Sequence, residues 1–146
     1  MVKYVKLIYR RFFMERTYVM IKPGFLQHEQ AIIARIEGIG AKVSHKKIMQ
    51  LDDEILNRHY AEHIGKGFFA ELVNYMKSGE VIAMCVEREG ENLVQDIRTI
   101  VGSTKDPAPG TIRHDFGIGE ITRNVIHSSD SIESANRELG IFFPEI

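Results

Sequence analysis

The sequence predicts an α+β domain in which helices cover a mainly antiparallel sheet. Three observations support this fold class: β-rich apolar runs alternate with segments of helical periodicity, glycine and proline separate the segments, and 146 residues suit one domain. The expected order is strand, helix, strand, helices, strand, helix, loop, helix and strand, which is that of a split βαβ sandwich. We expect the helices to lie on one side of the sheet.

The first half of the chain contains two predicted strands and two predicted helices. The apolar run at residues 17–21 is typical of a buried strand, and a Pro-Gly turn ends it. Isoleucines at helical spacing predict a helix at residues 32–39, and loose alternation predicts a partly exposed strand at residues 41–50. Asp52 is suited to cap a helix that continues through Ile64.

The second half repeats this alternation. Apolar residues at steps of four predict a helix at residues 68–76, and residues 81–86 have the pattern of a buried strand. A helix predicted at residues 93–101 stops at a glycine. A capping box of Asp130 and Glu133 predicts the start of the last helix, and Gly140 is expected to end it before an apolar strand. That last strand is predicted at Ile141, Phe142 and Phe143.

Composition excludes several classes of protein. The chain has 44% hydrophobic residues, and its 19 basic and 20 acidic residues leave a net charge of −1, which excludes disordered and fibrous proteins. No apolar run reaches the roughly 18 residues that cross a bilayer, so we expect no membrane partner. Near-zero charge argues against a dedicated nucleic-acid partner. The single cysteine, Cys85, cannot form an internal disulfide, and we therefore expect a cytoplasmic location.

Residues 1–13 mix basic and apolar side chains and allow three interpretations. A secretory signal is disfavoured because Lys6 and Arg10 interrupt the apolar stretch. An upstream start codon or a docked N-terminal strand fits the segment better. A basic segment that binds nucleic acid is the third interpretation, and it predicts salt-sensitive binding. We expect residues 1–15 to be an N-terminal extension and residues 16–146 to form a single domain.

Among motifs for chemistry, those of the common nucleotide folds and of serine hydrolases are absent from the sequence. His59, Glu62 and His63 match the His-x-x-Glu-His pattern of some zinc proteases, in which two histidines on one helical face bind zinc. The chain has six histidines, so such a short pattern recurs by chance. A solvated helix face edged by histidines is the preferred explanation of these residues.

Residues 102–128 form a predicted loop that is longer than the roughly 12–15 residues of a mere connection. Thr104 and Arg113 lie in it among glycines, and Arg98 lies on the helix that enters it. Arginine, hydroxyl and glycine-supplied backbone donors are what a polyphosphate needs. The alternative is a surface loop with solvated charges.

His127 lies near the end of this loop, just before the last helix, and serines surround it. A helix N-terminus disfavours a positively charged ring, and a nucleophilic imidazole must be neutral. His127 is therefore a candidate nucleophile, although a lone histidine is more often structural.

Several separate motifs together resemble the nucleoside diphosphate kinase family. They are Thr17-Tyr18-Val19-Met20-Ile21-Lys22-Pro23, the stretch PGTIR at 109–113, Asp115-Phe116, and Asn124-x-x-His127-x-Ser129-Asp130-Ser131. The resemblance is collinear over residues 16–143. It implies a ferredoxin-like sandwich with a four-stranded sheet. The implied activity is transfer of the γ-phosphoryl group of ATP or another nucleoside triphosphate to a nucleoside diphosphate through a phosphohistidine, and the implied assembly is a homo-oligomer, either tetramer or hexamer.

The resemblance also implies roles for individual residues. His127 resembles the phosphorylated nucleophile, Glu138 the glutamate that orients its ring, and Ser129 the serine beside it. Tyr60 resembles the tyrosine near the nucleophile, and Leu72 is a further supporting residue. The implied phosphate contacts are Lys22, Arg98, Thr104 and Arg113.

The nucleotide's other groups have implied contacts too. Asn124, with Lys22, resembles the ribose contacts, and Phe68 resembles the plate on which the base stacks. Stacking does not distinguish bases, so we expect low base selectivity. Mg²⁺ is expected to arrive on the nucleotide phosphates, because the sequence offers no dedicated carboxylate cage.

The chain departs from the family pattern in segments that shape the entrance of the cleft. Gly24 replaces an aspartate, His114 replaces a glycine, and Lys66-Gly67 replaces Arg-Pro. Residues 25–31 and the loop between Thr104 and Arg113 are shorter than in the family. An alternative function is therefore that of a catalytically impaired relative that binds nucleotide without transferring phosphate.

Overall fold

A four-stranded sheet forms the centre of the structure. The computed structural model describes residues 14–146, and the predictions for residues 1–13 lie outside this range. The strands are β1 (Met14–Ile21), β2 (Lys42–Met49), β3 (Val81–Glu89) and β4 (Ile126–Ser128). They lie in the order β2-β3-β1-β4, and every neighbouring pair is antiparallel. This is the ferredoxin-like arrangement, so the predicted fold class is confirmed.

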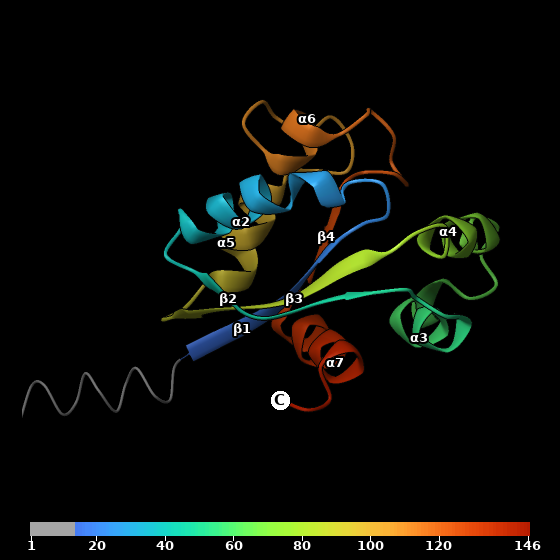
Figure 1. The fold of residues 1–146 in the computed structure, drawn as a ribbon, viewed down its shortest axis with the longest axis horizontal. Coiled ribbons are helices and arrows are strands. Elements are labelled where there is room, and N and C mark those ends of the chain that lie inside the picture. Colours follow the sequence, from blue (N-terminus) through green and yellow to red (C-terminus); the bar gives the residue numbers. More distant parts are fainter. Residues whose placement is uncertain (1–13) are drawn as a thin grey trace, which may run out of the picture.

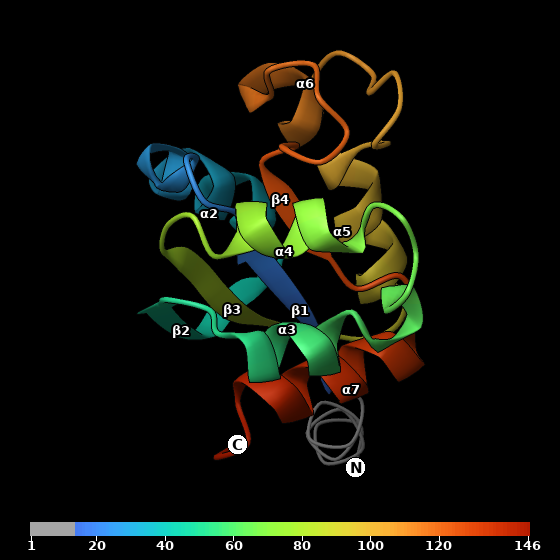
Figure 2. The ribbon, with the colours of Figure 1, turned by 90° about the vertical axis from the view of Figure 1, so that its right-hand side faces the viewer.

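Helices cover both faces of this sheet, and the expectation that they lie on one side is wrong. One face carries α2 (Glu29–Glu37) and α5 (Leu93–Val101), whereas the other carries α3 (Asp53–His59), α4 (Phe69–Met76) and α7 (Ile132–Phe142) (Figure 1). In Figure 2, α3 and α4 lie in front of the strands and α7 lies below them. The long loop before β4 contains the short helix α6 (Ile112–Phe116), and two 3-10 turns lie at Leu26–His28 and Ala61–His63.

Alternation along β1 explains the two-sided cover. Val19 and Ile21 are buried in the core beneath α2 and α5, whereas Tyr18 and Met20 are buried in the core beneath α7, α3 and α4. Successive side chains of a strand point to opposite faces, so a run that is apolar at every position needs cover on both sides.

The fourth strand is not where the sequence predicted it. It lies at Ile126–Ser128, and the apolar residues after Gly140 continue α7 to Phe142 instead of forming a strand. Phe142 is buried by this helix and stacks on Tyr18, with 4.4 Å between the ring centroids. A strand of three residues is too short to show a period in the sequence.

Two helix boundaries also differ from prediction. The helix capped by Asp52 does not reach Ile64 but ends at His59, after which Tyr60 leaves helical geometry and a 3-10 turn follows. The last helix is capped by Ser131 and not by Asp130, because the Ser131 hydroxyl accepts the Ser134 N–H at 3.0 Å. The Asp52 cap itself is confirmed, since its carboxylate accepts the N–H of Ile55 at 2.8 Å.

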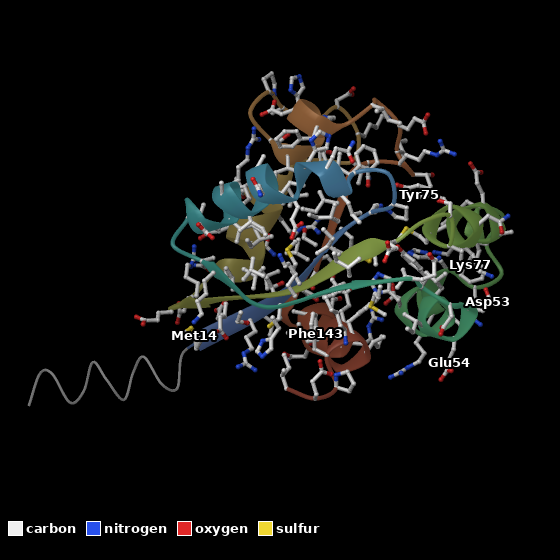
Figure 3. All side chains as sticks on the ribbon, viewed as in Figure 1. Met14, Asp53, Glu54, Tyr75, Lys77 and Phe143 are labelled. Carbon is white, nitrogen blue, oxygen red and sulfur yellow. The ribbon has the colours of Figure 1, made fainter. Side chains whose placement is uncertain are left out.

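An ion pair links the ends of the two helices that flank the segment 60–68. The Lys77 amino group, just after α4, lies 3.0 Å from the Asp53 carboxylate at the start of α3 (Figure 3). The pair links the two helix ends but is largely exposed, so it adds little stability. None of the described helices is long and apolar enough to cross a membrane.

Candidate active site

His127 lies on β4, the edge strand that pairs with β1. It pairs with Met20 of β1, and its side chain therefore points toward the face covered by α7. The ring is 23% exposed, and its Nε2 lies 2.8 Å from Oε2 of Glu138 on α7. A carboxylate only accepts hydrogen bonds, so Nε2 carries a proton, and in the neutral ring Nδ1 then holds the free lone pair.

Glu138 is held in place by a second hydrogen bond. It is only 3% exposed, and its Oε1 accepts a hydrogen bond from the Ser129 hydroxyl at 2.6 Å. Ser129 is in turn fixed to β1, because its N–H donates to the carbonyl of Tyr18 at 3.1 Å. The sheet, the serine and the carboxylate together determine the orientation of the His127 ring.

A cleft of about 470 Å³ opens in front of His127. Its walls come from the segment after α3, the end of α5, the loop that follows it, β4 and the start of α7. The sequence-predicted site residues that line it are Tyr60, Arg98, Thr104, Arg113, His127 and Glu138.

Lys22 lies deeper, at the end of β1, where it is 7% exposed. Its amino group donates to the Asn124 side-chain oxygen at 2.7 Å and to the Thr122 carbonyl at 3.4 Å. Burial, and then the positive charge of Arg113, lower the pKa of Lys22 to about 7. The predicted pair of Lys22 and Asn124 is thus in direct contact.

Arg113 is anchored to backbone on two sides of the cleft. It donates to the Gly102 carbonyl at 2.7 Å and to the Ile126 carbonyl at 2.9 Å. Gly102 has a φ of +92°, and an added Cβ would lie 2.5 Å from the Thr111 hydroxyl, so only glycine fits here. Burial, and then the charge of Arg98, lower the pKa of Arg113 to about 10.

In the part of the chain that the structure describes, the cationic groups around the cleft lie close to one another without direct ion pairs. Among residues 14–146, no ion pair with a carboxylate involves Lys22, Arg98 or Arg113. The lowered pKa values of Lys22 and Arg113 reflect the free-energy cost of this arrangement. An anion with several oxygens, such as a polyphosphate, would remove that cost.

The remaining predicted residues lie around the rim or outside the cleft. Phe68 is 51% exposed at the start of α4, and its ring lies 5.4 Å from that of the cleft residue His63. Leu72 packs instead against the core beneath α7, so it supports α4 and does not line the cleft.

The structure contradicts the zinc-protease interpretation. His59 ends α3, whereas Glu62 and His63 belong to a separate 3-10 turn, so the two histidines do not share one helical face. His59 does lie near His127 and Glu138, with ligand atoms within 4.8 Å of one another. Zinc bonds of about 2.1 Å allow ligand atoms at most about 4.2 Å apart, and the short contact of His127 with Glu138 is a hydrogen bond.

The departures at Gly24 and His114 leave the cleft walls in place. Gly24 has a φ of +91°, in the left-handed region that glycine adopts without strain. His114 is exposed and lies 2.9 Å from the Asp115 carboxylate. Asp115 is also paired with Arg35 of α2 at 2.7 Å, which fixes the loop that carries Arg113 to the body of the domain.

Sequence reasoning missed two features of this region. His59 is buried in the wall of the cleft beside Glu138. The His-x-x-Glu-His pattern singled out this residue but did not predict its position beside Glu138. Ile121 is 65% exposed and lines a groove between its loop and α4. Because Ile121 is an isolated apolar residue in a loop, the sequence around it does not predict that it lines a groove.

A ferredoxin-like domain in which an oriented histidine faces unpaired cations defines a class of phosphate-handling enzymes. The sequence model of the family described as nucleoside diphosphate kinase matches residues 15–146. A nucleoside diphosphate kinase of Bacillus anthracis is 47% identical over 136 residues, which cover 90% of each chain.

Solved structures agree with this assignment. The nucleoside diphosphate kinase of Encephalitozoon cuniculi superposes with a TM-score of 0.83 at 34% identity and covers 88% of each chain. That of Aquifex aeolicus gives 0.81 at 34% identity, over 89% of this chain and 95% of the other. The chain belongs to the nucleoside diphosphate kinase family. It is an enzyme that transfers phosphoryl groups between nucleoside triphosphates and diphosphates.

Proposed function

We propose that the phosphoryl group passes through a covalent intermediate on Nδ1 of His127. The observation that carries this proposal is the 2.8 Å hydrogen bond from Nε2 to Glu138 beside the cationic cleft. The bond leaves Nδ1 as the basic nitrogen of the ring, and the cations provide a site for the phosphates that must approach it.

The reaction has two in-line steps. In the first, the Nδ1 lone pair attacks the γ-phosphorus, the bond to the β,γ-bridging oxygen breaks, and the nucleoside diphosphate leaves with that electron pair. In the second, a β-phosphate oxygen of another diphosphate attacks the phosphorus, and the phosphorus–nitrogen bond breaks. The ring recovers its lone pair, and Nε2 keeps its proton bonded to Glu138 throughout.

The charged residues of the cleft would stabilise the transferred group. Arg98, Arg113 and Thr104 would contact phosphate oxygens, and their charges and hydroxyl suit the negative charge of the transition state. Lys22 would bind phosphate and, with Asn124, the ribose hydroxyls. Tyr60, which lines the same cleft, would restrict the movement of the His127 side chain.

Phe68 would stack on the base at the rim, with Leu72 supporting the helix that carries it. Stacking does not distinguish one base from another, so the enzyme would accept nucleotides of any base. It would thereby maintain the pools of nucleoside and deoxynucleoside triphosphates. We also propose a cytoplasmic homo-oligomer, a tetramer or hexamer.

Magnesium would enter as part of the nucleotide substrate. Among the described residues, the one cluster of three ligand-type side chains is His59, His127 and Glu138, and its carboxylate is already hydrogen-bonded. The ion would therefore be held chiefly by phosphate oxygens, where it neutralises their charge.

The test is a labelling and chase experiment. The protein is incubated with Mg²⁺ and γ-labelled ATP, and the label is expected to be acid-labile, alkali-stable and located on His127. Addition of a different nucleoside diphosphate should then transfer the label to that nucleotide. The control His127→Ala should take up no label while it binds nucleotide with unchanged affinity. Nucleotide binding without any label in the wild-type protein would favour the impaired relative.

A further inference from the structure

His59 lies directly behind the reacting histidine, where the proposed mechanism gives it no role. Its side chain is 1% exposed, and its ring meets the His127 ring edge-on, with 4.8 Å between centroids and 80° between planes. Its Nδ1 lies 3.5 Å from Oε2 of Glu138, the same oxygen that accepts the hydrogen bond of His127.

We propose that His59 is a positioning residue, whose Nδ1–H donates to Oε2 of Glu138 and so keeps the proton of His127 on Nε2. This inference rests on the proposed function of His127 as the nucleophile. His59 would be a third donor to the Glu138 carboxylate, in addition to His127 and Ser129.

The carboxylate has room for this third donor. Within residues 14–146, the polar contacts of Glu138 are those with Ser129 on one oxygen and with His127 and His59 on the other. Each carboxylate oxygen accepts two hydrogen bonds, so Oε2 has one acceptor position left. Because Glu138 is only 3% exposed, little water can reach this acceptor position. A buried acceptor position without a donor costs free energy.

His59 is suited to be a neutral donor. Burial, followed by the positive charge of groups around it, lowers the pKa of His59 well below its usual value. Those groups are His127, Arg137, Lys22 and His63. Among the described residues, neither ring nitrogen of His59 has a hydrogen-bond partner within ordinary geometry, so the Nδ1–H has no competing acceptor. A contact of 3.5 Å is at the outer limit of a hydrogen bond, and such contacts in substrate-free sites shorten when the complex forms.

The chemical consequence concerns the position of one proton. Two donors on Oε2 make this oxygen a weaker base, so it does not remove the Nε2 proton of His127. They also stop the carboxylate from rotating away from the ring. The tautomer with the proton on Nε2 is then dominant, and it is the one that directs a lone pair at the cleft.

Two substitutions separate donation from packing. His59→Phe keeps a ring of similar size but has no donor, and His59→Asn places an amide N–H near the position of Nδ1. His45→Asn is the matched control, because His45 lies on β2 and makes its polar contact with Ser44. Three quantities are measured on each folded enzyme: the single-turnover rate of phosphorylation by ATP, the nucleotide dissociation constant, and the His127 tautomer by ¹⁵N NMR.

We expect His59→Phe to slow phosphorylation by about ten- to a hundredfold, by analogy with the loss when outer partners of metal-bound histidines are removed. Its nucleotide affinity should stay unchanged, and its ¹⁵N spectrum should show more of the Nδ1–H tautomer of His127. His59→Asn should restore the rate to within a few-fold and restore the tautomer, while His45→Asn matches the wild type.

Wild-type rate and tautomer in His59→Phe would overturn the proposal. An Asn variant as slow as the Phe variant, with a wild-type tautomer in both, would also overturn it, because packing alone would then explain the loss. If the Phe variant does not fold, the tautomer in the Asn variant decides. The NMR measurement needs no phosphoryl transfer, so failure of this inference is distinguishable from failure of the proposed nucleophile.

Discussion

Lys22 is expected to make nucleotide binding weaker as the pH rises above about 7. In the free protein its pKa is lowered to about 7, chiefly by burial, so a large share of the amino groups is neutral in mildly alkaline solution. A bound phosphate favours the charged form, and binding above this pH must therefore be accompanied by uptake of a proton.

The size of the effect follows from the pKa. If nucleotide binds only to protein in which Lys22 is charged, the apparent dissociation constant is multiplied by a ratio. This ratio is that of total protein to protein with a charged Lys22. With a pKa of about 7, this ratio is about 11 near pH 8. We thus expect about a tenfold loss of affinity between pH 6 and pH 8, with nearly one proton taken up per site at the upper end.

Isothermal titration calorimetry with ADP and Mg²⁺, in two buffers of different ionisation enthalpy, measures both quantities. Lys22→Arg is the control, because arginine stays charged throughout this range and the titration of the ADP phosphate is common to both proteins. Equal pH dependence in the wild type and Lys22→Arg, or no proton uptake in the wild type, would refute the reasoning.

The same shift affects the stability of the nucleotide-free protein. Between pH 7 and pH 10.5 the unfolded lysine holds a proton that the buried one has released. The unfolded state then binds more protons, so the free energy of unfolding should rise with pH over this window. Lys22→Met should remove the rise in urea titrations.

Three further outcomes are expected. Phe68→Ala should raise the apparent KM of every nucleotide by a similar factor of about 5 to 150, since stacking is worth about 1–3 kcal/mol; an effect on one base alone would contradict this. Gly102→Ala should lower the free energy of unfolding by about 1–3 kcal/mol more than Gly90→Ala. Both glycines have a positive φ, but only at Gly102 would the Cβ collide with Thr111, so equal losses in urea melts would exclude the collision. Ser131→Ala should cost about 1 kcal/mol through loss of the α7 cap, and an unchanged melting temperature would argue against that cap.

Local signals in the sequence were sufficient where a single residue or a long pattern decides the structure. The Asp52 cap, the buried strand β3 and the end of α5 at Gly102 all follow from side-chain chemistry or backbone freedom within a few residues. Such features depend little on the rest of the fold, and they are confirmed.

The errors occur where distant contacts decide. The helix from Asp52 ends at His59, although apolar spacing continues to Ile64, because the chain turns there to form the cleft wall. Phe142 stays helical because it packs on Tyr18 from β1, a contact that the sequence around Gly140 does not reveal. Tertiary packing overrides local preference in both cases.

The sequence by itself determined the α+β class and the family resemblance, and it singled out the candidate site residues, including His127 and the cations around it. Only the tertiary structure decided how they act together. It places Glu138 on the Nε2 side of His127, brings Lys22 to Asn124 across about a hundred residues, and buries His59 behind the carboxylate. The physical reason is that residue type defines what a side chain can donate or accept. The direction of a hydrogen bond and the cost of burying a charge depend on neighbours that only the fold brings within reach.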